Sequence, residues 1–177
     1  TLFAFRLSAN VAAWTNEAQL RRSTAERFPD EGYPLYLFGQ TSAERGDHES
    51  AISLFRQSLR KTRPGEKHAA PLRVCLARSL RARGELESAL ATLLESFCKG
   101  TDGKAQPIVD LNFNLTTEGV LNIAHAVADF ELAWLEVDSF DPTSLAAVRQ
   151  QGKTRICSGE NLYTNRQFRP FFEAQSM

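Results

Sequence analysis

Three short apolar runs in the C-terminal half of the chain each lead into a carboxylate. The runs end in Asp110, Glu136 and Glu160, the two intervals between these acids are nearly equal, and helix-like segments fill them. Strands that alternate with helices predict parallel βα units, whose strand ends and following loops share one face. Three carboxylates on one face, with no Cys or His cluster beside them, predict a site for a hard cation such as Mg²⁺.

The residues around these acids resemble the enolase superfamily, and most closely its mandelate racemase-like branch, which includes sugar-acid dehydratases. The matching segments are Val109–Asn112, Trp134–Glu136, Ser158–Thr164 and Phe168–Arg169. The resemblance covers roughly residues 106–177 and implies a (β/α) barrel in which acids ending three successive strands bind Mg²⁺. Carried over to this chain, the metal ligands are Asp110, Glu136 and Glu160, and Asn112 is the substrate-binding residue.

The resemblance also implies a reaction, the removal of a proton α to a substrate carboxylate that Mg²⁺ holds. In the sugar-acid branch, a β-hydroxyl then leaves as water. The family's Lys-x-Lys pair, which supplies a base, has no counterpart around residues 76–84, and Val137-Asp138 stands where Glu-Pro usually follows Glu136. The catalytic base is therefore unknown, and we expect the chain alone to show no dehydratase or racemase activity.

A full barrel of this kind has about 250 residues and eight strands. We assign about three βα units to residues 104–177 and therefore expect a partial barrel there. Unpaired strand edges tend to be covered in natural proteins. We expect the helical half, another copy in an oligomer, or residues outside this sequence to cover the open edge.

The N-terminal half contains an internal repeat, since Arg45–Ile52 recurs as Arg83–Leu90. Such recurrence is typical of helical repeat arrays. The first copy resembles a tetratricopeptide repeat (TPR) in the spacing of Leu35, Gly39, Gly46, Ala51, Phe55 and Pro64. We expect Gly39 to allow close helix packing, Gly46 to end the first helix, and Phe55 to fill the groove between helices.

The second copy carries Gly84 at the turn and Leu93 in the place of Phe55. Residues 1–30 read as a further helix, with an apolar face that includes Val11, Trp14 and Leu20. Pro29 closes this segment, because proline ends helices.

Together these patterns predict an α + α/β protein: residues 1–99 form a TPR-like helical repeat domain, and residues 104–177 form the partial barrel. The stretch Cys98–Lys104 is polar, has two glycines, and is our candidate linker. We expect limited proteolysis to cut there first.

Three helices are expected in the C-terminal half. One follows Thr117 with Val120, Ile123, Ala124 and Val127 inward, and a second starts at Asp141-Pro142. Asn165 is expected to cap the third, with Phe168, Phe171 and Phe172 inward.

Charge and cysteine content exclude some classes of function. Lys plus Arg equals Asp plus Glu, 21 each, so net charge gives no case for nucleic-acid binding. No apolar run is long enough for a membrane-spanning helix. Three widely spaced cysteines, Cys75, Cys98 and Cys157, fit reduced thiols in the cytoplasm. The start lacks Met and a signal peptide, so we expect an interior piece of a longer protein, or a fusion.

Two functions remain open at this point. One is an enolase-superfamily enzyme, or a remnant of one, with Mg²⁺ and a sugar-acid substrate. The alternative is a TPR-type module that binds a protein or peptide partner and has no catalytic activity.

Overall fold

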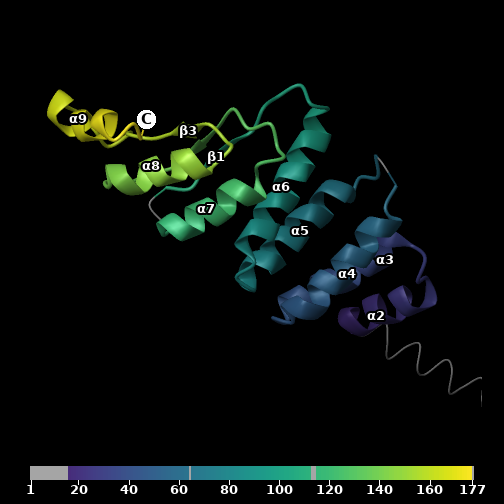
Figure 1. Cartoon of the computed structure of the whole chain (residues 1–177). Coiled ribbons are helices and arrows are strands. Elements are labelled where there is room, and N and C mark those ends of the chain that lie inside the picture. The colour runs from purple at the N-terminus through teal and green to yellow at the C-terminus, as the bar shows by residue number, and fades with distance from the viewer. Residues whose placement is uncertain (1–15, 64, 113–114, 177) are drawn as a thin grey trace, which may run out of the picture. The chain divides into compact units, whose positions relative to one another are not determined.

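The computed structural model describes residues 16–63, 65–112 and 115–176 (Figure 1). Of the first expected helix, Val11 and Trp14 therefore lie outside the described residues. The chain divides into two compact units, Thr1–Glu85 and Leu86–Met177.

The division falls earlier than the expected linker, Cys98–Lys104. Helix α6 spans Leu86–Thr101 and so runs through most of that stretch. Leu94 of α6 is buried in the core of the second unit, and Leu90 packs against this core. Residues 98–101 are thus the last turn of a helix, in which Lys99 and Gly100 are exposed, and the chain turns at Asp102 and Gly103, both with positive φ.

The first unit is built from helices. They are α2 (Glu17–Arg27), α3 (Gly32–Glu44), α4 (His48–Lys61) and α5 (Ala69–Ala82). The N-terminus of α2 is capped by Asn16, whose side chain accepts from the N–H groups of two residues in the first turn, and Asp47 caps α4 by accepting from the N–H of Ser50. Helix α2 ends at Arg27, ahead of Pro29, as predicted.

Helices α3 and α4 lie side by side at very short range (Figure 1). A Cβ added at Gly39 would lie 2.6 Å from Cε1 of Phe55, a ring that is itself fully buried. The Ser58 hydroxyl donates a 2.7 Å hydrogen bond to the carbonyl oxygen of Gly32. Two features therefore hold α3 against α4. Gly39 leaves room for the Phe55 ring, and a buried hydrogen bond joins Ser58 to Gly32 at the start of α3.

The internal repeat appears in the structure as two helices, α3 and α5, that end in the same way. Gly46 and Gly84 have φ of 79° and 80°. The N–H of Asp47 donates to the carbonyl oxygen of Ser42 at 3.0 Å, and Glu85 donates to Leu80 at the same distance. This is the Schellman arrangement, which needs a residue with positive φ, so both predicted turns are confirmed.

The repeat does not extend to the packing of its second copy. Leu93 is 42% exposed, whereas Phe55 is 0% exposed. The prediction that Leu93 takes the place of Phe55 is therefore wrong. Because the turn repeats but the packing of Phe55 does not, the TPR assignment of residues 1–99 stays a prediction.

The second unit alternates helices with a small parallel sheet. After α6 come β1 (Ile108–Asp110), α7 (Thr117–Ala126), β2 (Trp134–Glu136), α8 (Pro142–Gln151), β3 (Ile156–Cys157) and α9 (Asn165–Glu173). The strand order is β1-β2-β3, and both pairings are parallel. The described elements thus form the partial α/β arrangement that the apolar runs predicted.

The two faces of this sheet differ. Val109 and Leu135 are buried in one core with residues of α7 and α8, which lie side by side (Figure 1). Ile108 and Trp134, which are partners in the β1–β2 register, are exposed. Because side chains alternate along a strand, Asp110 and Glu136 belong to the exposed set.

The local predictions for the C-terminal helices hold with two exceptions. Asp141 caps α8 as expected, with Pro142 in the first turn. Thr164, not Asn165, caps α9: its hydroxyl accepts from the N–H of Gln167, whose side chain bonds back in a capping box. Phe172, expected inward, is exposed.

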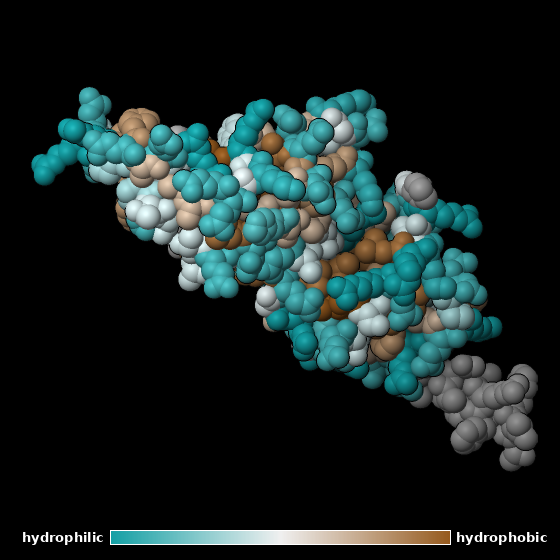
Figure 2. Space-filling view, in the orientation of Figure 1, coloured by the Kyte–Doolittle hydropathy of each residue, from teal (hydrophilic) through white to brown (hydrophobic). Residues whose placement is uncertain are grey.

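The surface visible in Figure 2 is mostly hydrophilic, with several apolar areas between hydrophilic side chains. Among the described residues, no helix has both the length and the apolar character needed to cross a membrane. Cys75, Cys98 and Cys157 are free thiols, as predicted.

We predict that Gly39→Ala destabilises the first unit by about 1–3 kcal/mol, because the new methyl group overlaps the Phe55 ring and the buried ring has little room to move. The matched control is Gly100→Ala in α6, where an added Cβ meets nothing within 4 Å. Chemical unfolding of both variants measures the difference. Equal stability of the two variants would show that the α3–α4 contact is looser than described.

The neighbouring phenylalanines of α9 provide a second test. Phe171 is 4% exposed and Phe172 63%. We expect Phe171→Ala to cost about 3–5 kcal/mol of unfolding free energy. Phe172→Ala should cost about 1 kcal/mol, since it loses only its stacking on Phe168. Urea titrations of the two variants decide; a larger loss for Phe172 would reverse our assignment of the α9 inner face.

Candidate functional site

The predicted acids follow the carboxyl ends of the three parallel strands. Asp110 and Glu136 are the last residues of β1 and β2 and are direct partners in the register. Glu160 comes later relative to its strand, because β3 ends at Cys157 and Gly159 turns with φ of 102°. All three therefore belong to one end of the sheet, which in α/β barrels is the end that carries catalytic residues.

A fourth acid, Asp138, lies with them and was missed as a site residue. It is only 8% exposed, and burial is the main cause that raises the pKa of its carboxyl above the ordinary value. The charges of Glu160, Glu136 and Asp110 raise this pKa further, as does a side-chain hydrogen bond with Glu160. The sequence held a signal: a residue two positions after Glu136 in an extended chain faces the same way.

Two of the acids are also tied to their own loops. The backbone N–H of Asn112 donates to Oδ1 of Asp110 at 2.8 Å, and the Asn161 side chain donates to Oε1 of Glu160 at 3.2 Å. Each bond uses one carboxylate oxygen and leaves the other. Asn112 has φ of 50°, a conformation that asparagine tolerates well, and its side chain is exposed. Its predicted contact with substrate stays a prediction.

Cys157 is the partner of Glu136 in the β2–β3 register. Burial raises the pKa of its thiol, and so does the negative charge of Glu136. The thiol of the metal-free chain is therefore protonated at neutral pH. The acidic side chains at this end of the sheet supply oxygen donors.

Oxygen donors of this kind fit Mg²⁺ in chemistry. The Oδ2 atom of Asp138 is buried and has no hydrogen-bond partner, an unusual state for a carboxylate oxygen and one that a cation would satisfy. In the part of the chain that the structure describes, however, no three His, Cys, Asp or Glu side chains stand close enough to form a metal site. The predicted ligands share an end of the sheet but do not form a closed ligand set.

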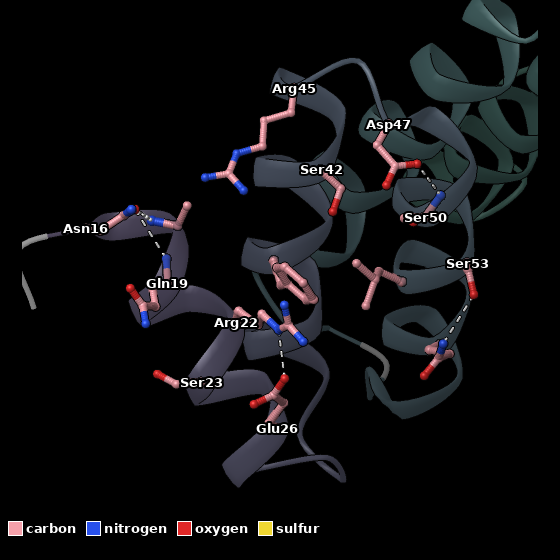
Figure 3. A pocket seen from close by; sticks show the side chains of 14 residues that line it. Asn16, Gln19, Arg22, Ser23, Glu26, Ser42, Arg45, Asp47, Ser50 and Ser53 are labelled. Atoms are coloured by element: carbon pink, nitrogen blue, oxygen red, sulfur yellow. Dashed lines mark hydrogen bonds and ion pairs between the residues drawn. The ribbon is translucent and has the colours of Figure 1, made fainter. Parts of the chain in front are cut away.

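A hollow of about 740 Å³ lies in the first unit, between α2, α3 and α4 (Figure 3). Its polar side chains are largely engaged with one another or with the backbone. Asn16 and Asp47 cap helices, and Arg22 forms a 2.8 Å bond with Glu26. Arg45 extends toward the opening of the hollow (Figure 3). Binding of a protein or peptide partner by these helices therefore stays a prediction.

A model of the enolase C-terminal domain-like family matches residues 79–177, more than half of the chain. The chain belongs to this family. The match takes in β1, β2 and β3 and begins within α5, ahead of α6. The resemblance noted around the three acids is thus confirmed at the level of the family.

Two solved structures from Burkholderia xenovorans are similar to this chain. Both are described as L-alanine-DL-glutamate epimerases. One is 38% identical over 58% of this chain, with a TM-score of 0.44. The other, bound to magnesium and fumarate, is 26% identical over 83% of this chain, also with a TM-score of 0.44. The chain spans 23% and 36% of their lengths. A search of curated proteins found no match.

The raised pKa of Asp138 makes a prediction about stability and pH. Between its ordinary pKa and the higher pKa in the folded state, the folded chain binds more protons than the unfolded chain. Asp138 therefore lowers stability as pH rises through this window, and its full cost is present above the window. We expect Asp138→Asn to be more stable than the wild type at neutral pH, with the difference shrinking toward about pH 4. Urea unfolding across pH, in chelator, measures it; a pH-independent difference would contradict the prediction.

Proposed function

We propose that this chain is the metal-binding part of an enolase-superfamily enzyme that removes a proton α to a substrate carboxylate. The observation that carries the proposal is the position of the three acids at one end of the parallel sheet: Asp110 and Glu136 end their strands, and Glu160 follows the third. The chain's membership of the enolase C-terminal domain-like family supports the same chemistry, since enolase superfamily members bind Mg²⁺.

Each acid has a defined part in this proposal. Asp110, Glu136 and Glu160 would hold the cation through the oxygens that their own loops leave unused. The cation, when bound, supplies a Lewis acid that attracts the substrate carboxylate and spreads its negative charge. Asn112, exposed in the loop after β1, is our proposed contact to substrate.

The substrate class is the less constrained part of the proposal. Racemases, epimerases and dehydratases of the superfamily share proton removal and differ in the step that follows. We retain a sugar acid as the proposed substrate, on the resemblance of the segments around the three acids. The general base is assigned to no described residue.

The proposal is tested by the effect of Mg²⁺ on thermal unfolding. A ligand that binds only the folded chain adds RT ln(1 + [L]/Kd), about 2.7 kcal/mol at a hundredfold excess over Kd. We expect millimolar Mg²⁺ to raise the melting temperature of the wild type relative to chelator, and Glu136→Gln to lose this rise.

The matched control is Glu131→Gln, the same substitution at an exposed residue ahead of β2, at the other end of the strand. It should keep the full response to Mg²⁺. An unchanged wild-type melting curve, or an equal shift in wild type and Glu136→Gln, would reject the proposed metal site.

A further inference from the structure

Another hollow of the first unit, of about 350 Å³, is lined mostly by charged side chains. Helix α4 supplies Arg56 and Arg60 to its lining, and the turn after α5 supplies Arg83 and Glu85. Glu49, in the first turn of α4, also lines it, with Oε2 3.9 Å from Nη1 of Arg83. Arginines from two separate elements thus come together around one hollow.

Arg56 and Arg60 are a like-charged pair, four residues apart on the same side of α4. Arg22 of α2 and Arg169 of α9, by contrast, each form an ion pair with a glutamate four residues later. Within the part of the chain that the structure describes, neither Arg56 nor Arg60 has a hydrogen bond or an ion pair of its side chain. Like charges at this spacing destabilise a helix, and an anion bound between them removes the repulsion.

A role in the stability of α4 accounts for Arg60 but not for Arg56. Arg60 lies in the last turn of α4, where the helix dipole favours a cation. Arg56 lies one turn earlier, is exposed, and has no acid three or four residues away in either direction. Its charge contributes nothing to the helix, so its presence in the hollow is better explained by a ligand.

We propose that this hollow binds the phosphate group of a small molecule through Arg56 and Arg60, with Arg83 as a third contact. A guanidinium group donates two parallel N–H groups, which match the oxygens of a phosphate. Three arginines and two glutamates give the hollow a formal charge of +1, which suits one small anion and not a nucleic acid. The site belongs to the first unit and is independent of the acids at the end of the sheet.

The experiment is an NMR titration of the full chain with inorganic phosphate, without divalent cations and at an ionic strength held constant with chloride. We expect saturable shifts of arginine Nε–H signals and of amides in α4. Arg56→Gln should weaken binding at least about tenfold, because it removes a charge-assisted hydrogen bond. The matched control is Arg81→Gln, the same loss of charge at an exposed residue of α5, which should keep the wild-type Kd. Glu136→Gln should keep it too.

The outcomes decide between a site and general attraction of anions. Shifts that do not saturate, or equal weakening in Arg56→Gln and Arg81→Gln, would overturn the proposed site. Acetate at the same ionic strength should bind more weakly than phosphate, and an equal Kd for the two anions would overturn the assignment to phosphate. Melting curves in chloride alone report folding. If Arg56→Gln melts lower than the wild type, Arg60→Gln takes its place, and an unchanged Kd there would equally overturn the inference.

Discussion

The parallel register of three short strands is the constraint on which the second unit depends. Asp110 and Glu136 are direct partners, and adjacent strands lie about 4.8 Å apart, so two carboxylates must share one end of the sheet. Like charges at that distance repel each other. Burial of Leu135, which is fully buried between the strands and the helices, fixes the register in spite of this repulsion. The apolar core therefore determines where the acids lie.

The same core explains why one face of the sheet remains open. Apolar residues of α7 and α8 pack against Val109 and Leu135 on one side of the sheet. Ile108 and Trp134 on the other side stay exposed among the described residues. In a closed barrel this second set is interior and fills layers of side chains. Ile108 and Trp134 thus occupy the positions that inward-facing residues take in a barrel wall, in agreement with the family of the chain.

Sequence reasoning was reliable where the structure is decided locally. Gly46 and Gly84 end helices because their φ is positive, and Asp141 caps α8 because its side chain reaches two free N–H groups. It was wrong where tertiary packing decides. Phe171 and Phe172 are equally apolar, and only the position of the α9 axis separates buried from exposed. Residues 98–101 are polar like a linker, yet Leu90 and Leu94 hold their helix to the core.

Asp138 shows why the candidate site was only partly predictable. The three acids at strand ends were recognisable from spacing, because parallel strands bring their ends together whatever the sequence between them. The importance of Asp138 depends on its burial, which is set by chain segments far away in sequence. A buried carboxylate oxygen without a hydrogen-bond partner, such as Oδ2 of Asp138, is an exception to the rule for buried polar atoms, and such exceptions concentrate at functional sites. A carboxylate kept in this position lowers the stability of the folded chain. Under the proposed function, this loss of stability is what a ligand bound at the end of the sheet would offset.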